Sequence, residues 1–383
     1  MRRFIIIFVS LLFIAIHYGA ILYVNSSLLS NFFGSGVVGL LFILGALGNI
    51  LLFLLAPKLI QKFGKRILLF FSLVISILTT VGMTFFTTEL PVAISFVIYT
   101  SFVSIIFYCL DIFLEELSTD ARTGEIRGIY LTCVALGMTL GPFILAILST
   151  TNSGLKPTYL AAAFLLIPPL LLSIFSFKSR TPRAHHPYHH SLRLPFGAWW
   201  RARSIRHVTL ARLALEAFFS FMVAYAPIYL HNNLGFEWSE LGIMFAIMLL
   251  PFIFLEWPAG ELADRLLGEK ELMVVGFLIT GASLLIMPFI GKVFLAWTVI
   301  LLISRIGASL IESMTESYFF KHVSAEETGL LSIFRLTRSM GNVSGVVVGT
   351  IALSLFPFEK TFFVLAIVIF LGLKESLHLR DTL

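Results

Sequence analysis

The sequence predicts an all-α membrane protein with twelve transmembrane helices in two six-helix halves. Hydrophobic residues make up 58% of the 383 residues and charged residues only 13%, whereas an average soluble domain carries about 25% charged residues. Apolar runs long enough to cross a bilayer recur along the chain, and two patterns of its first half return in the second. Because a soluble fold cannot hide so much apolar surface, the composition excludes a cytosolic enzyme, a secreted domain and a disordered chain.

Twelve apolar runs predict the spans. They are too long and continuous for the short alternating strands of a membrane barrel. The first run exceeds a typical signal-peptide core and no clear cleavage site follows it, so we expect a retained helix. Cys109 and Cys133 lie inside such runs, and we expect them to be packing residues rather than a disulfide. The predicted spans are 4–24, 37–57, 67–88, 91–117, 125–150, 157–178, 208–232, 239–262, 271–290, 294–320, 328–355 and 359–373.

The distribution of positive charge predicts the orientation. An even number of spans puts both termini on one side. If that side is cytoplasmic, the outer loops hold only Lys156, Lys292 and Lys360. Apart from Arg305, which lies within a span, the other Lys and Arg residues then fall at inner ends or inner loops, as the positive-inside rule requires. We therefore predict cytoplasmic termini, in the plasma membrane of a prokaryote.

A polar segment, 179–207, separates an N-terminal bundle (1–178) from a C-terminal bundle (208–383). Trp199 and Trp200 follow a Pro-rich and Arg-rich stretch, which fits either a short amphipathic helix on the inner leaflet or a solvated linker. The run H-H-P-Y-H-H (185–190) could bind Zn²⁺ or Ni²⁺ in vitro. Nothing supplies a supporting second shell, so we predict a solvated linker and no metal site.

The two halves share an internal repeat. The connection between the second and third spans reads P-K-L-I-Q-K-F-G-K-R (57–66), and about 203 residues later the connection between the eighth and ninth reads G-E-L-A-D-R-L-L-G-E-K (260–270). Likewise, S-T-D-A-R-T-G (118–124) matches S-A-E-E-T-G (324–329). Duplicated six-helix units usually form the substrate path between them.

At these residues the chain resembles the major facilitator superfamily of secondary transporters. That family has the signature G-x-L-A-D-R-x-G-[RK]-[RK] after its second span and a weaker copy after the eighth. Here the second copy is the better one, because it keeps Gly260, Asp264, Arg265 and Gly268 with one inserted residue. The resemblance implies that Asp264 helps to lock the outward-facing state.

The first copy departs further from the signature. It keeps Gly64 and Arg66, but Gln61 stands in the place of the Asp. Gln61 can form hydrogen bonds but carries no charge, so the lock in the first half is in doubt.

Span five carries a second, shorter resemblance. The run G-M-T-L-G-P from Gly137 through Gly141 to Pro142 is similar to the G-x-x-x-G-P of proton-coupled exporters in the family. The glycine pair that normally follows is absent, because 143–146 reads F-I-L-A. The alternative is close helix packing with a proline kink.

Charged residues inside predicted spans are the candidate transport residues, because each costs about 2.5–3.5 kcal/mol unless it faces a partner or a cavity. Arg305 lies near the middle of span ten. It would bind an anionic or polar part of the solute or balance a carboxylate; the alternative is a structural ion pair with Glu256 or Glu312. Arg305, Ser309, Glu312 and Glu316 share one helical face.

Glu216 and Glu256 are the candidate proton carriers, since a carboxyl group in an apolar site holds its proton more tightly than one in water. Glu216 could instead pair with Arg212, one turn away. His17 is a further candidate, although a buried packing histidine is the more common case. The resemblance implies that spans one, four, seven and ten line the path, with neutral walls that include Tyr108 and Tyr225.

A cytoplasmic gate is the last predicted feature. Asp111, Glu115 and Glu116 lie close to the inner boundary, where they could pair with the cations Arg122, Arg127, Arg335 and Arg338. Such ion pairs would break when the halves rock. The alternative is a solvated surface.

The predicted function is secondary active transport of a small organic solute by alternating access, proton-coupled and leaning toward efflux antiport. The alternatives are a proton-coupled importer of a sugar or aromatic acid, and a non-transporting receptor or scaffold. We expect no enzyme, since H-E-x-x-H and G-x-S-x-G are absent, and no ATP site, since there is no P-loop. The expected partners are the solute, protons and the bilayer, with no nucleic acid and no cofactor, and the chain is expected to be a monomer.

Overall fold

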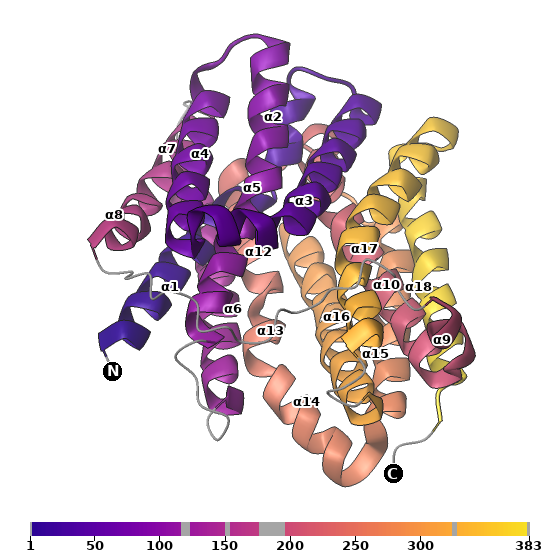
Figure 1. Ribbon diagram of the computed structural model, residues 1–383. Helices are drawn as coiled ribbons and strands as arrows, with labels where there is room; N and C mark the ends of the chain where they lie inside the picture. Colours follow the sequence, from indigo (N-terminus) through magenta and orange to yellow (C-terminus); the bar gives the residue numbers. More distant parts are fainter. Residues whose placement is uncertain (1, 116–122, 150–153, 176–195, 324–327, 381–383) are drawn as a thin grey trace. The chain divides into compact units, whose positions relative to one another are not determined.

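The structure, a computed structural model, describes residues 2–115, 123–149, 154–175, 196–323 and 328–380 (Figure 1). Every regular element within these ranges is a helix. Nine helical runs of the described residues are long and apolar enough to cross a membrane, and Trp238–Phe254 is a shorter apolar run. The prediction of an all-helical membrane protein is therefore confirmed.

The chain divides into two compact units, of which the first comprises Met1–Thr181 and Leu230–Ile247. Most of α12 also belongs to this unit, although α12 lies in the second half of the sequence. The helices of this unit are α1 (Arg2–Leu22), α2 (Asn25–Ser30), α3 (Ser35–Phe63), α4 (Lys65–Phe85), α5 (Glu89–Glu115), α6 (Thr123–Leu148), α7 (Lys156–Leu165), α8 (Ile167–Phe175) and α12 (Trp238–Met248).

The second unit comprises Pro182–Tyr229 and Met248–Leu383. Its α-helices are α9 (Phe196–Arg201), α10 (Arg203–Ala224), α11 (Ala226–Ile228), α13 (Leu250–Phe254), α14 (Glu256–Leu262), α15 (Gly268–Ile286), α16 (Phe294–His322), α17 (Thr328–Leu355) and α18 (Thr361–Leu377). Two π-helical turns, η2 (Tyr229–Asn233) and η3 (Ala263–Leu267), and two 3₁₀ turns, η4 (Met287–Phe289) and η5 (Phe358–Lys360), complete the described elements.

Both units use the same pattern of helix packing. In the first, α1 packs on α6, and α4 packs on α5 and α7. In the second, α10 packs on α17, and α15 packs on α16 and α18. The corresponding helices occur in the same order along the two halves of the sequence, so the internal repeat is visible as a repeated packing scheme.

The turns that carry the repeated motif also correspond. Gly64, between α3 and α4, has φ 85° and ψ 148°, and Gly268, at the start of α15, has φ 76° and ψ 159°. Residues with a side chain rarely adopt a positive φ of this kind, so each turn favours glycine. The residue inserted in the second motif falls in η3, because a π-helical turn holds one more residue than an α-helical turn.

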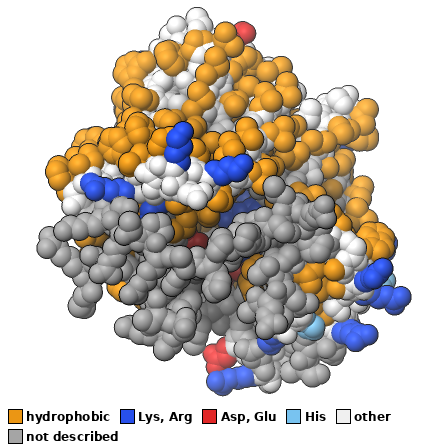
Figure 2. All heavy atoms as spheres, viewed as in Figure 1, with side chains coloured by type: hydrophobic (Ala, Val, Ile, Leu, Met, Phe, Trp, Pro, Cys, Tyr) orange, Lys and Arg blue, Asp and Glu red, His pale blue; other side chains and the backbone are white. Residues whose placement is uncertain are grey.

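The outward faces of the helices are apolar. On α3 the exposed side chains Leu40, Leu44, Leu47, Leu51 and Leu54 recur every three or four residues and form one stripe. Hydrophobic side chains also cover much of the described surface in the upper part of Figure 2. Such a surface is suited to lipid rather than water.

Candidate functional site

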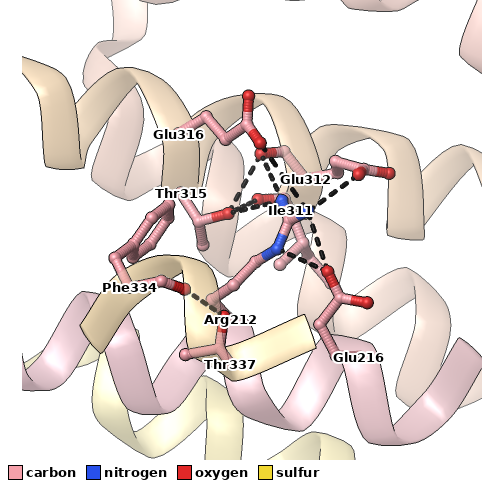
Figure 3. Close-up of polar contacts among 8 residues, drawn as sticks. All are labelled: Arg212, Glu216, Ile311, Glu312, Thr315, Glu316, Phe334 and Thr337. Carbon is pink, nitrogen blue, oxygen red and sulfur yellow. Dashed lines mark hydrogen bonds and ion pairs between the residues drawn. The ribbon is translucent and has the colours of Figure 1, made fainter. Parts of the chain in front are cut away.

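A charged, partly buried cluster in the described part of the second unit surrounds Arg212 on α10 (Figure 3). Its Nε and Nη2 atoms lie 2.9 and 2.8 Å from Oε1 of Glu216. Nη2 also donates to Oε1 of Glu312 at 2.9 Å and lies 3.7 Å from Oε1 of Glu316. Nη1 donates to the Glu312 carbonyl oxygen at 3.2 Å. One guanidinium group thus faces three carboxylates from two helices.

Helical spacing and close packing position these side chains. Arg212 and Glu216 are four residues apart on α10, and Glu312 and Glu316 are four residues apart on α16, so each pair shares a face. A third helix closes the site at Gly341 of α17, where a Cβ atom would lie 2.2 Å from Cβ of Glu216. Only glycine at that position allows α17 to approach so closely.

Burial increases across the cluster from α16 to α10. The side chain of Glu316 is 49% exposed and that of Glu312 26% exposed, whereas Arg212 and Glu216 are 6% and 5% exposed. Glu256, half-buried at the start of α14, lies within electrostatic range of Arg212, Glu312 and Glu316. A buried negative charge without a matching cation is costly, and here three carboxylates share the single cation of Arg212.

Arg212 is the residue that sequence reasoning underrated. Its role in the sequence analysis is limited to an alternative partner of Glu216, although it is the centre of the cluster. The sequence pattern that could have identified it is the pair of opposite charges, Arg212 and Glu216, four residues apart inside an otherwise apolar span. Glu216 and Glu312 lie together as candidate residues of one site.

Arg305 lies two turns from Glu312 on α16 and is only 1% exposed. Its guanidinium carbon lies 4.9 Å from the ring centre of Phe218 and 5.2 Å from that of Phe219. Both rings belong to α10. Arg305 is therefore held by cation–π contacts beside the Arg212 cluster.

His17 belongs to a neutral network in the first unit. It is fully buried on α1, its Nδ1 lies 2.8 Å from the Ala162 carbonyl oxygen, and its Nε2 lies 3.0 Å from the hydroxyl of Tyr99. A carbonyl oxygen can only accept, so Nδ1 carries the hydrogen and a neutral ring accepts from Tyr99 at Nε2. This geometry favours the packing interpretation of His17.

The two predicted tyrosines occupy different surroundings. The hydroxyl of Tyr225 lies 3.0 Å from the Val346 carbonyl oxygen and 2.7 Å from the hydroxyl of Thr350, and so links the residue that follows α10 to α17. Tyr108 is half-buried on α5, with its ring edge-on to Phe53 of α3.

Gly137 and Gly141 of the exporter-like motif lie in the contact between α6 and α1. A Cβ atom on Gly137 would lie 2.4 Å from Cβ of Ala15, and one on Gly141 would lie 2.3 Å from the backbone nitrogen of Ala20. The carbonyl oxygen of Pro142 would lie 2.7 Å from a Cβ atom on Gly242. The motif therefore has a packing role, and its exporter interpretation stays a prediction.

The residues of the signature motif are partly described. Arg265 forms an exposed ion pair with Glu261 at 3.1 Å, and Gln61 is exposed near the end of α3. Arg66 donates to two carbonyl oxygens at the end of α8. Gly260 lies in α14, with nothing within 4 Å of an added Cβ atom. The Asp264 side chain lies outside the described residues.

Among the described residues of the predicted gate, Arg335 is exposed on α17 within electrostatic range of Glu316, and Asp111 is half-buried on α5. The other predicted gate residue in the described part is Arg338. The side chains of Glu115, Glu116, Arg122 and Arg127, and the run 185–190, lie outside the described residues.

Comparisons with known proteins agree with this architecture. A family model described as Major Facilitator Superfamily matches residues 3–266 and 217–374. The nucleoside transporter NupG has a similar structure, with a TM-score of 0.78 and 14% sequence identity over 98% of this chain and 99% of that one. A point mutant of the same transporter gives a TM-score of 0.80 at 13% identity, with the same coverage. No curated protein sequence matches.

These structural likenesses, at such low identity, bear on the fold alone. The family model covers nearly the whole chain and includes both copies of the signature motif. The chain therefore belongs to the major facilitator superfamily and is a secondary transporter rather than an enzyme.

Proposed function

We propose that the transporter is coupled to protons and exports a small organic solute by antiport. The observation that carries the proposal is the cluster in which Arg212 faces Glu216, Glu312 and Glu316. If all three carboxylates were ionised, the cluster would hold two excess negative charges within helices that span the membrane. Protons are the simplest ions to balance them.

The graded burial supports a route for these protons. Glu316 is half exposed and exchanges protons with water, whereas Glu216 is buried and paired with Arg212. A bound proton weakens one carboxylate's contact with Arg212, so protonation changes how α10 and α16 are held together. Coupling follows if this change accompanies the exposure of the solute site to the opposite side.

Arg305 is the proposed contact for an anionic or polar part of the solute, because it places a buried cation over aromatic rings on α10, two turns along α16 from Glu312. The export direction rests on the similarity of Gly137–Pro142 to an exporter motif. Import by symport is the alternative, supported by Glu256 beside Pro258, which resembles an acidic residue in the eighth span of some symporters in the family.

The proposal is tested in sealed proteoliposomes that contain a pH-sensitive dye. The external panel contains sugars, aromatic acids, lipophilic cations and nucleosides, the last because a nucleoside transporter has the same fold. Alkalinisation of the lumen that depends on a solute supports antiport, and acidification supports symport. Uptake of a solute with no pH change would rule out proton coupling.

Two variants test whether the Arg212 cluster is responsible for the proton coupling. Glu216→Gln should abolish the pH change, because the amide cannot bind a proton. Glu89→Gln, at an exposed position at the start of α5, is the matched control and should leave the pH change intact. Loss of the signal in both variants, or in neither, would contradict the role of Glu216.

A further inference from the structure

The first unit has a groove between α4 and α8, one end of which is formed by Arg66 of the first signature copy. Its volume is about 290 Å³, and it is lined by Arg66, Ile67, Phe70, Phe71, Ser173 and Ile174. The two helices are in direct contact along it. Ile67, Phe71 and Ile174 are 46%, 55% and 38% exposed, so the walls are apolar and open outward.

Arg66 provides the charge of the groove. Its Nε atom donates to the Ser173 carbonyl oxygen at 2.9 Å, and Nη2 donates to the Ile174 carbonyl oxygen. These bonds fix the guanidinium group at the C-terminal end of α8. They use two of its five N–H donors, so donors remain for an anionic oxygen.

Two exposed cations precede Arg66 in the sequence. Lys58 and Lys62 are exposed in the last turns of α3, immediately before the turn at Gly64 that leads to Arg66. A cationic end joined to an open apolar groove matches a molecule with an anionic head and an apolar tail. Free phosphate would contact only the cationic end of the groove, and a neutral apolar molecule would contact only its apolar walls.

We propose that this groove binds an anionic phospholipid, with its phosphate on Arg66 and part of an acyl chain against Ile67, Phe70 and Phe71. The site lies at the end of the helices predicted to be cytoplasmic, where anionic lipids and basic side chains attract each other by about 1 kcal/mol per cation. The proposal does not depend on the solute or on proton coupling.

Native mass spectrometry of the full chain, purified in detergent, tests the proposal. The probes are phosphatidylglycerol and phosphatidylcholine with identical acyl chains. We expect wild-type protein to retain phosphatidylglycerol preferentially, and Arg66→Gln to reduce that retention about fivefold while phosphatidylcholine retention is unchanged. Lys270→Gln, at the equivalent position of the repeat, is the matched control and should retain the lipid. Equal losses in both variants, or no loss in either, would overturn the proposal.

Three further variants separate the effect of charge from that of shape. Arg66→Lys keeps the charge but not the paired bonds to α8, and should still prefer phosphatidylglycerol; a loss equal to that of Arg66→Gln would overturn the proposal. Ile67→Trp fills the groove and should reduce retention, whereas Leu78→Trp, at an exposed position on the same helix, should not. Displacement of the lipid by inorganic phosphate at equal concentration would also overturn the proposal, because it would indicate a simple anion site.

Discussion

Two pairs of identical residues at the same spacing show what burial does to an ion pair. Arg212–Glu216, within α10, and Arg265–Glu261, which joins η3 to α14, are both four residues apart, with closest N–O distances of 2.8 and 3.1 Å. The first pair is 6% and 5% exposed, and the second is 74% and 40% exposed. Removing a partner from a buried pair leaves a charge that water cannot reach, whereas an exposed partner is simply hydrated.

Arg212→Ala should therefore destabilise the protein by about 3–5 kcal/mol, because the buried carboxylates lose their common cation. Arg265→Ala should cost about 0–1 kcal/mol. Thermal unfolding of both variants in the same detergent measures the difference. The double variant Arg212→Ala/Glu216→Ala should recover part of the loss. Similar melting temperatures for the two single variants would contradict this account.

At this scale, the sequence pointed to buried charges but left their pairing open, with Arg212 named only as an alternative partner of Glu216. Glu216 and Arg305 stand out because charged residues are rare in apolar runs. Whether Glu312 meets Arg212 depends on the rotation of α16 against α10, whose contacts here join residues about 100 positions apart. The periodicity of a single helix does not determine that rotation.

Among the helices, glycine seams bring two pairs into close contact. On α17, added Cβ atoms at Gly341 and Gly345 would lie 2.2 and 2.1 Å from atoms of α10, and one at Gly349 would lie 2.1 Å from the ring of Tyr225, just after α10. Gly137 and Gly141 of α6 play the same part against α1. Small residues four apart are the usual means by which membrane helices pack closely.

Gly345→Ala should destabilise the second unit by about 1–3 kcal/mol, because its Cβ atom would lie 2.1 Å from the Ala217 carbonyl oxygen and would force α10 and α17 apart. Gly260→Ala is the matched control, since an added Cβ atom there has nothing within 4 Å. Thermal unfolding in detergent compares the two. An equal effect of both substitutions would show that the seam is not the cause.

The sequence identified the glycines of span five but left open whether they serve helix packing or transport. A G-x-x-x-G pattern occurs both in closely packed helices and in transport motifs. The short distances between α6 and α1 at Gly137 and Gly141 show the packing role directly. The π-helical turn η3 was also indicated only indirectly, as one residue too many in the second motif.

On the scale of the whole chain, the fold was predictable because the hydropathy pattern and the internal repeat both extend over hundreds of residues. The all-helical membrane fold and the family are confirmed. The sidedness of the termini stays a prediction, since it rests on the placement of Lys and Arg alone.

Single cysteines introduced into a chain whose Cys109 and Cys133 are replaced by alanine test the sidedness. Lys292→Cys should react with a membrane-impermeant thiol reagent in intact cells, because it lies in a predicted outer loop. Lys62→Cys, in a predicted inner loop and exposed in the structure, should react only after permeabilisation. The reverse pattern would invert the predicted orientation.

The π-helical turn η3 has a consequence for the history of the two halves. Before this turn the two copies are 203 positions apart, as at Pro57 and Gly260, and after it they are 204 apart, as at Gly64 and Gly268. One added residue has been absorbed within a single turn, and the glycine that ends it has kept its backbone conformation. Duplicated halves can thus drift in length at a helix end without losing the geometry of the bend that follows.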